Sequence, residues 1–226
     1  MTPTLVLTRP ESQARALVAE LGLDLPVVIA PVLEIAPAAP PPDLGGYRGV
    51  ILTSVNGVDH APDLTGKRVY CVGQRTAEAA RAKGGDVRLV TPDAARFVRQ
   101  IQAEGPLVHL HGRHRAGTVA EDLTLAGLET HSVTVYEQNA LSLTEEAKAL
   151  IEGSSRVILP LYSPRTARLV GAGVARVGPN VHVIAISPAA AEAWTAETGH
   201  SPEVCAEPDG ETMRKRIRAA CETESP

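Results

Sequence analysis

Four arginines stand where a predicted strand gives way to a predicted helix, beside residues such as Gly, Ser and Pro. They are Arg9, Arg75, Arg113 and Arg165. The helix dipole disfavours a cation at a helix start, so a cation that recurs there indicates an anion that guanidinium and backbone N–H groups bind together. The pattern predicts sites for a ligand with several carboxylates or phosphates. Four solvated arginines, or arginines paired with acids, would give the same pattern.

The remaining polar motifs are weaker. Ser, Thr and Asn beside these arginines are good helix caps, which explains most of the hydroxyl groups there. His109 and His111 share one face of a predicted strand and His114 follows, but no carboxylate or thiol cluster stands nearby, so no metal site is predicted. Phosphate loops of the Gly-Xaa-Gly-Xaa-Xaa-Gly and Gly-Lys-Ser/Thr types are absent, and no cofactor is expected. Tyr136 lies in a predicted connector, where it either projects into a cleft or packs the hinge.

Short apolar runs alternate with helix-like segments along the chain. Unbroken Val, Ile and Leu runs are typical of parallel strands that helices cover on both faces, so the alternation predicts an α/β fold with parallel sheets. The predicted strands are residues 5–7, 27–29, 50–52, 69–72, 87–90, 107–110, 133–135, 157–161 and 181–186. The predicted helices are residues 11–22, 76–83, 94–104, 117–126, 144–152, 166–171, 189–198 and 211–222.

An internal repeat indicates two similar domains. The related segments begin at Val69 and Val183, at Val50 and Val157, and at Leu5 and Leu107. Because the copies occur in different orders, one domain must be discontinuous, with the other inserted within it. The predicted domains are residues 1–32 with 139–226, and an inserted domain of residues 43–130. Residues 33–42 and 131–138 are predicted linker strands, and a cleft between domains is a usual place for a ligand.

The composition argues against several classes of function. The chain has 226 residues, of which 44% are hydrophobic and 21% charged, as in globular proteins. A net charge of −4 and 3% aromatic residues provide neither a basic field nor stacking surfaces for nucleic acid. No apolar run is long enough for a membrane span, and the amino terminus does not resemble a signal peptide. Three scattered cysteines without a CxxC pair suit a reducing cytosol, so a cytoplasmic protein is expected.

Six short motifs occur in an order and spacing that resemble one family. They are Leu7-Thr8-Arg9-Pro10, Val50-Ile51-Leu52-Thr53-Ser54-Val55-Asn56-Gly57-Val58, Val72-Gly73-Gln74-Arg75-Thr76-Ala77, Leu110-His111-Gly112-Arg113, Val135-Tyr136 and Leu161-Tyr162-Ser163-Pro164. The chain resembles uroporphyrinogen-III synthase along nearly its whole length. The resemblance implies two similar flavodoxin-like α/β domains with parallel sheets, joined by a two-stranded β linker, with the active site in the cleft.

The resemblance also implies a lyase of tetrapyrrole (heme) biosynthesis that needs no cofactor and acts as a monomer. Its substrate is hydroxymethylbilane, a linear polycarboxylate that loses water and closes to uroporphyrinogen III with ring D inverted. The pyrrole nitrogen expels the hydroxyl, so the enzyme acts mainly by positioning. Tyr136 resembles the family's linker tyrosine and would donate a hydrogen bond to the departing hydroxyl. The substrate-binding residues implied are Thr8, Arg9, Ser54, Asn56, Gly73, Arg75, Thr76, Gly112, Arg113, Ser163, Arg165 and Ser187.

Two segments depart from the family's pattern. The family's Gly-Pro-Xaa-Thr-Ala turn appears as Ser187-Pro188-Ala189-Ala190-Ala191, which removes a threonine hydroxyl. Residues 56–67 form a short segment that contains Pro62 and leaves little room for the usual helix. A competing function, a non-catalytic cytosolic binding or sensor module for a polycarboxylate tetrapyrrole, would use the same residues without chemistry.

Overall fold

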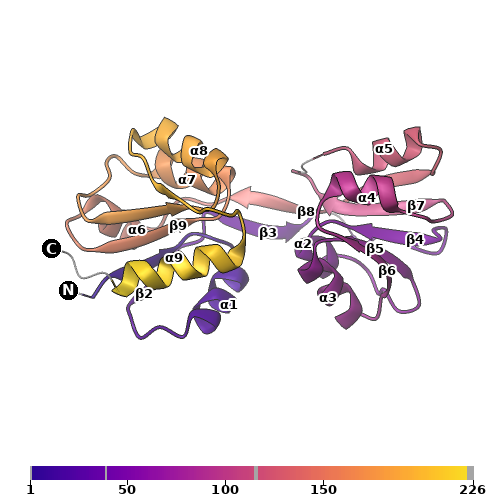
Figure 1. Ribbon diagram of the computed structural model, residues 1–226, viewed down its shortest axis with the longest axis horizontal. Helices are drawn as coiled ribbons and strands as arrows, with labels where there is room; N and C mark the ends of the chain where they lie inside the picture. Colours follow the sequence, from indigo (N-terminus) through magenta and orange to yellow (C-terminus); the bar gives the residue numbers. More distant parts are fainter. Residues whose placement is uncertain (1, 39, 115–116, 223–226) are drawn as a thin grey trace. The chain divides into compact units, whose positions relative to one another are not determined.

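The chain passes twice between two units of structure (Figure 1). Unit 1 comprises Met1–Glu34 and Asn139–Pro226, and unit 2 comprises Ile35–Gln138. The computed structural model describes residues 2–38, 40–114 and 117–222. Residues 1, 39, 115–116 and 223–226, all of which fall within the predicted domains and linkers, lie outside the described residues.

Unit 1 is built on a five-stranded sheet in which every adjacent pair of strands is parallel. Its strands, in spatial order, are β11 (Glu203–Val204), β10 (Val181–Ala185), β9 (Val157–Leu161), β1 (Thr4–Leu7) and β2 (Val27–Ile29). Its helices are α1 (Glu11–Leu21), α6 (Glu145–Glu152), α7 (Pro164–Gly173), α8 (Pro188–Thr198) and α9 (Gly210–Glu222). A parallel sheet needs such crossovers, because each one returns the chain to the edge where the next strand starts.

Both faces of the unit 1 sheet are buried under helices. Val6 packs into the apolar core with Trp194 beneath α6, α7 and α8. Its neighbour Leu7 packs into the opposite core with Ile217, beneath α1 and α9. Successive side chains of a strand point to opposite faces, so a strand covered on both sides must be apolar throughout. This burial explains the unbroken apolar runs of the sequence.

Unit 2 has the same layered arrangement around a six-stranded sheet. In spatial order its strands are β3 (Leu33–Pro37), β8 (Thr130–Ala140), β7 (Leu107–Gly112), β4 (Gly49–Leu52), β5 (Arg68–Val72) and β6 (Asp86–Thr91), and the pairs from β8 to β6 are parallel. Its helices are α2 (Val55–Asp59), α3 (Gln74–Ala82), α4 (Ala94–Gln100) and α5 (Val119–Leu125). Leu52 packs towards α2 and α3, whereas Phe97 packs on the other face with α5. The predicted α/β fold with parallel sheets is confirmed.

The two sheets share one spatial order but not one chain order. The strand series β2-β1-β9-β10-β11 of unit 1 corresponds to the series β8-β7-β4-β5-β6 of unit 2. Strand β1 thus corresponds to β7, β9 to β4, and β10 to β5, and these are the strand pairs that the sequence repeat relates. The order along the chain is circularly permuted. Strands β3 and β8, in which the chain passes between the units, are neighbours in the sheet.

Lys83 binds the carbonyl groups at the carboxyl end of the short helix α2. Helix α2 has only five residues, and the Lys83 ammonium group donates hydrogen bonds to the carbonyls of Val58, Asp59 and Ala61 at 2.8, 3.1 and 2.6 Å. Carbonyl groups at a helix end lack partners within the helix, and a cation there also interacts favourably with the dipole. The short segment that contains Pro62 is therefore fastened to the end of α3.

Three elements differ from the sequence-based prediction. Helix α2 was not predicted, because five residues are too few to show a helical period. Strand β11 was not predicted either, because its two residues are too few to show the pattern of a strand. The helix predicted over 94–104 ends at Gln100, where the next residue, Ile101, is extended and packs into the apolar core around Phe97. Among the described residues, no helix combines the length and apolar character that crossing a membrane requires.

Candidate functional site

The carboxyl ends of the parallel strands collect the predicted site residues at one edge of each sheet. In unit 1, Thr8 and Arg9 follow β1, Ser163 and Arg165 follow β9, and Ser187 follows β10. In unit 2, Ser54 and Asn56 follow β4, Gly73, Arg75 and Thr76 follow β5, and Gly112 ends β7. Arg113 follows β7 but is not at a helix start as predicted, because α5 begins only at Val119. This edge is where α/β sheets bind ligands, because helix starts and loops converge there.

Tyr136 contacts two other predicted site residues across the unit 2 sheet. It lies in β8 beside Gly112, and an irregularity after His111 lets Gly112 pair with Tyr136 and not with Val135. A Cβ at Gly112 would lie 2.5 Å from two ring carbons of Tyr136, so only glycine leaves room for the ring. The ring thus crosses the end of β7, and the Tyr136 hydroxyl oxygen lies 3.1 Å from Ser54 Oγ, beyond β4.

Ser54 is held in place because it caps α2. Its backbone is extended, and its Oγ accepts a hydrogen bond of 3.0 Å from the Gly57 N–H. At the other end of α2, the His60 ring lies 5.7 Å from the centre of the Tyr136 ring. The His60 Nδ1 lies 2.9 Å from the Asn56 carbonyl oxygen. His60 is a neighbour of the phenol that the sequence did not indicate, because no motif or helical period includes it.

Arg113 is already paired with an acid. Its Nε donates to Glu137 Oε1 at 2.8 Å, its Nη2 contacts the same oxygen, and its backbone N–H donates to the Tyr136 carbonyl at 2.9 Å. Pairing with an acid is one of the alternatives that the sequence left open for these arginines. The Arg113 side chain is 61% exposed, so the ion pair contributes little stability, and a ligand carboxylate can compete with Glu137 for the guanidinium.

At the start of α3, Gly73 sets the backbone conformation and Arg75 is an exposed side chain. Gly73 has a φ of 86°, in the left-handed region that favours glycine, and its N–H donates to the Thr91 carbonyl at 2.7 Å. Thr76 is buried and Arg75 is exposed. A Cβ at Gly73 would have only Thr76 Oγ1 within 4 Å, so backbone conformation, not space, selects glycine here.

In unit 1, Arg9 lies over an aromatic ring. Its guanidinium carbon is 4.0 Å from the centre of the Tyr162 ring, and Nη2 donates to Gln13 Oε1 at 3.1 Å. Burial raises the pKa of Tyr162 to about 12, against the lowering effect of Arg9, so Tyr162 is a neutral phenol at neutral pH. Tyr162 belongs to a quoted motif but was not predicted as a site residue, because only the pairing of β1 with β9 brings it to Arg9.

Two hydroxyl groups at this edge of unit 1 are buried without a hydrogen-bond partner among the described residues. They are Thr8 Oγ1, on a side chain with no exposed surface, and the hydroxyl of Tyr162. A buried hydroxyl without a partner costs about 1–3 kcal/mol of stability. A ligand oxygen that reached these groups would recover part of that cost, so they are candidate binding groups in unit 1.

Ser163 and Ser187 act as helix caps. Ser163 Oγ accepts from the Thr166 N–H at 3.1 Å and donates to Thr166 Oγ1 at 2.9 Å. Ser187 Oγ accepts from the Ala190 N–H at 3.3 Å. A proline begins each of these helices, as the sequence pattern predicts. Ala190, where the family pattern has threonine, is fully buried, and Arg165 is half-buried in the first turn of α7.

The histidines of β7 bind hydroxyl groups. His109 Nε2 lies 3.2 Å from Thr53 Oγ1, and His111 Nε2 lies 2.7 Å from Ser132 Oγ. The two imidazole rings are 5.0 Å apart. In the described part of the chain, no three His, Cys, Asp or Glu side chains come together in a group that could hold a metal ion.

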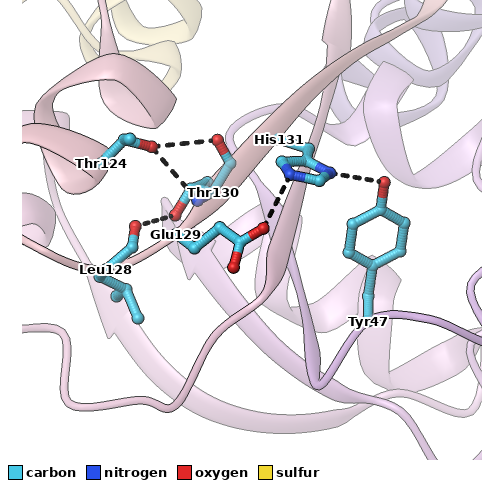
Figure 2. A network of polar contacts seen from close by, with 6 residues as sticks. All are labelled: Tyr47, Thr124, Leu128, Glu129, Thr130 and His131. Atoms are coloured by element: carbon cyan, nitrogen blue, oxygen red, sulfur yellow. Dashed lines mark hydrogen bonds and ion pairs between the residues drawn. The ribbon is translucent and has the colours of Figure 1, made fainter.

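A second polar network lies at the amino end of the unit 2 sheet (Figure 2). The Tyr47 hydroxyl is 3.1 Å from His131 Nδ1, and His131 Nε2 is 3.2 Å from Glu129 Oε1. Thr124 Oγ1 donates to the Thr130 carbonyl and accepts from the Thr130 N–H, both at 3.2 Å. These contacts join the start of β8 to the segments before β4 and after α5, so the network has a structural role at the edge away from Tyr136.

The comparisons with known proteins agree with this arrangement. A family model described as Uroporphyrinogen-III synthase HemD matches residues 12–213. The chain belongs to the uroporphyrinogen-III synthase family. The comparison with curated proteins gives no match to this chain.

Solved structures of this family share the fold. The Helicobacter pylori uroporphyrinogen-III synthetase matches with a TM-score of 0.69 and 15% identity, over 97% of this chain and 99% of that chain. A mutant synthase from Thermus thermophilus matches with a TM-score of 0.57 and 16% identity, over 98% of this chain and 100% of that chain. The predicted function, a lyase of the uroporphyrinogen-III synthase family in heme biosynthesis, is confirmed, and the sensor alternative is not favoured.

Proposed function

We propose that this synthase closes hydroxymethylbilane to uroporphyrinogen III with Tyr136 as the hydrogen-bond donor to the departing hydroxyl. The observation that carries the reaction is the family match over residues 12–213. The role of Tyr136 rests on its position at the carboxyl edge of unit 2, with its hydroxyl beside Ser54 at 3.1 Å.

The chemistry needs positioning more than a strong acid. The hydroxyl leaves with the electron pair of the C–O bond, the pyrrole nitrogen supplies the replacing pair, and the pyrrole N–H proton completes the water molecule. A neutral phenol that donates a hydrogen bond stabilises the negative charge that develops on the departing oxygen. Closure then proceeds through attack of the substituted carbon of ring D on the new methylene carbon, which gives a spirocyclic intermediate. The older bond between that substituted carbon and the bridge to ring C breaks and re-forms at the free α-carbon of ring D, which inverts the ring. The proton lost from this α-carbon balances the proton that the pyrrole nitrogen of ring A regains. The substrate also closes spontaneously to the wrong isomer, so the protein must favour this path by holding the other rings.

The carboxylates of the substrate meet different groups in the two units. In unit 1, Thr8 and Tyr162 contribute hydroxyls and Arg9 a guanidinium, which suits a carboxylate. In unit 2, Arg113 exchanges Glu137 for a substrate carboxylate. Gly112 makes room for the Tyr136 ring, and Gly73 sets the backbone ahead of α3, since its own N–H donates to the Thr91 carbonyl. The other predicted residues lie at helix starts, where backbone N–H groups suit a carboxylate, and these are Asn56, Arg75, Thr76, Ser163, Arg165 and Ser187.

The strand order supports the finer architecture that the family resemblance implies. The order β2-β1-β9-β10-β11 is the 2-1-3-4-5 order of flavodoxin-like sheets, and unit 2 has its permuted counterpart. We therefore assign two flavodoxin-like domains, with β3 and β8 as the two-stranded linker. We also assign a cytoplasmic monomer, in keeping with the three free cysteines, and light scattering of the pure protein tests the monomer.

Incubation with freshly prepared hydroxymethylbilane, followed by oxidation and isomer separation, tests the function. We expect the type III isomer, and formation of type I alone would refute the synthase assignment. Tyr136→Phe should lower kcat about tenfold with KM within about twofold, because one transition-state hydrogen bond is lost. Tyr47→Phe removes a phenol hydroxyl at the opposite edge and should leave kcat unchanged. Wild-type kcat in Tyr136→Phe, with type III product retained, would remove Tyr136 from the mechanism but not the activity.

A further inference from the structure

We infer that Ser54 is a positioning residue that donates a hydrogen bond to Tyr136 and so directs the Tyr136 O–H towards the substrate. The inference rests on the proposed role of Tyr136. It assigns Ser54 a different task from the carboxylate binding that the family resemblance implies.

The position of Ser54 Oγ is set by groups that do not depend on a ligand. The Gly57 N–H donates to it at 3.0 Å, and the extended backbone of Ser54 follows directly from β4. Lys83 fastens the far end of α2 through three carbonyls. Ser54 Oγ is therefore fixed in two ways: it caps the amino end of α2, and Lys83 holds the carboxyl end of the same short helix.

The phenol is equally constrained. Tyr136 is only 5% exposed, and its ring fills the space that a side chain at Gly112 would occupy. The His60 ring lies beside it, tilted by 37°, with the ring centres 5.7 Å apart. In the described structure, the Tyr136 hydroxyl oxygen and Ser54 Oγ share one hydrogen bond, with 3.1 Å between the two oxygens. The pair therefore has one proton between the two oxygens and one proton that points outward.

The backbone N–H of Gly57 favours one direction for this chain of hydrogen bonds. A backbone N–H can only donate, so Ser54 Oγ accepts from Gly57, and a hydroxyl that accepts a hydrogen bond becomes a better donor. The mutually strengthening order runs from the Gly57 N–H to Ser54, from Ser54 to Tyr136, and from Tyr136 to the departing hydroxyl. In this order the outward proton belongs to the phenol. The reverse order would leave the outward proton on Ser54 and no donor on the phenol.

A set of Ser54 variants separates donation from capping. Ser54→Ala removes both the hydrogen bond to Tyr136 and the cap of α2, and Ser54→Thr keeps both of these interactions. Ser54→Asp keeps the cap, because a carboxylate accepts from the Gly57 N–H, but it cannot donate to Tyr136. We expect kcat to fall about three- to tenfold in Ser54→Ala and Ser54→Asp and to stay within about twofold in Ser54→Thr. The KM of Ser54→Ala should stay within about twofold.

A double variant tests whether Ser54 acts through Tyr136. Adding Ser54→Ala to Tyr136→Phe should cause no further loss of kcat, because the donor that Ser54 supports is already gone. Losses that multiply, or a Ser54→Ala variant with raised KM and unchanged kcat, would overturn the inference and return Ser54 to carboxylate binding. Thr144→Ala is the matched control, because Thr144 caps α6 through the Ala147 N–H at 3.3 Å and contacts no tyrosine in the described structure. It should lower the melting temperature by a similar amount and leave kcat unchanged.

A spectroscopic measurement keeps the inference testable without turnover. The infrared C–O stretching band of Tyr136, assigned by difference against Tyr136→Phe, depends on whether the phenol accepts or donates a hydrogen bond. We expect this band to shift in Ser54→Ala and Ser54→Asp but not in Ser54→Thr or Thr144→Ala. An unshifted band in Ser54→Ala would refute the hydrogen bond to Ser54 even if the synthase assignment held. A shifted band in a protein that made only type I product would uphold the bond and refute the proposed function.

Discussion

The carboxyl edges of the two sheets have the same strand order but differ in two buried hydroxyl groups. In unit 2, the polar side chains are joined to one another, as Ser54 is to Tyr136 and Arg113 to Glu137. In unit 1, the Thr8 and Tyr162 hydroxyls are buried with no hydrogen-bond partner among the described residues. The edge of unit 1 therefore combines serines that the protein fixes as helix caps with two hydroxyl groups whose hydrogen bonds are unmet.

The difference indicates a division of labour between the two edges. A group that must donate at one place in the transition state benefits from being fixed before the substrate arrives. A group that binds a carboxylate can stay unsatisfied in the free protein, at some cost in stability, because the ligand restores the hydrogen bond. Under the proposed function, unit 2 would accordingly carry the catalytic hydrogen-bond donor, and the unit 1 hydroxyls would bind carboxylates. Three measurements test this division.

The largest effect is expected at Gly112. Its replacement in Gly112→Ala would put a Cβ 2.5 Å from the Tyr136 ring, so the ring must leave Ser54 or the strands must separate. We expect the free energy of unfolding of unit 2 to fall by about 1–3 kcal/mol, as for other overpacked cores, and kcat to fall at least as far as in Tyr136→Phe. Gly46→Ala is the control, because nothing lies within 4 Å of a Cβ there. Hydrogen exchange of unit 2 and steady-state kinetics measure both effects, and wild-type kcat in Gly112→Ala would show that the ring need not stay fixed.

Buried threonines should respond in opposite ways in the two units. Thr8→Val removes a hydroxyl without a partner, so the free energy of unfolding should rise by about 1 kcal/mol while KM increases several-fold. Thr91→Val removes a hydroxyl that donates to the Asp93 carbonyl at 2.9 Å, so stability should fall by about 1 kcal/mol. Urea unfolding followed by the fluorescence of Trp194, the single tryptophan, reports on unit 1, and hydrogen exchange reports on unit 2. If Thr8→Val as well as Thr91→Val lowered the free energy of unfolding, the Thr8 hydroxyl would have a hydrogen-bond partner in the folded protein.

The smallest effect is expected from alkaline pH, which acts on groups whose pKa burial raises. Cys71 in unit 2 and Tyr162 in unit 1 show the largest shifts, and burial also raises the pKa of Cys205 and of Cys221 in unit 1. Burial raises the pKa of Cys71 from 9.0 to about 11 and the pKa of Tyr162 from 10.0 to about 12. The unfolded chain ionises first, so unfolding releases a proton between the two pKa values of each group. Stability is therefore complete below about pH 9, and the Cys71 and Tyr162 contributions are lost by about pH 11 and 12.

Near pH 10 we expect a loss of about 1 kcal/mol from Cys71 and a few tenths of a kcal/mol from Tyr162. Urea unfolding as a function of pH measures these losses. Cys71→Ala should reduce the loss of unfolding free energy between about pH 9 and 11, and Tyr162→Phe should reduce the loss between about pH 10 and 12. An unchanged pH profile in both variants would show that neither neutral form is favoured by folding.

Local patterns predicted the elements and the places of the site residues. Ser163 and Ser187 precede prolines after apolar runs, and this context alone identifies them as caps of α7 and α8. The apolar runs identify buried parallel strands, and therefore the sheet edge at which polar residues collect. His60 and Tyr162 were missed as site residues because their importance comes from a neighbour on another strand or helix.

The alternation of strand and helix, the caps and the family could be predicted from the chain, because these depend on residues that are close along it or on motifs in a set order. Which polar groups meet depends on how the strands are arranged in the fold. Ser54 and Tyr136 are 82 positions apart, and their contact requires β7 to lie between β4 and β8. It also requires the irregularity after His111, which aligns Gly112 with Tyr136. Strand register turns a side chain to one face or the other, so a shift of one residue would have taken the phenol away from the serine.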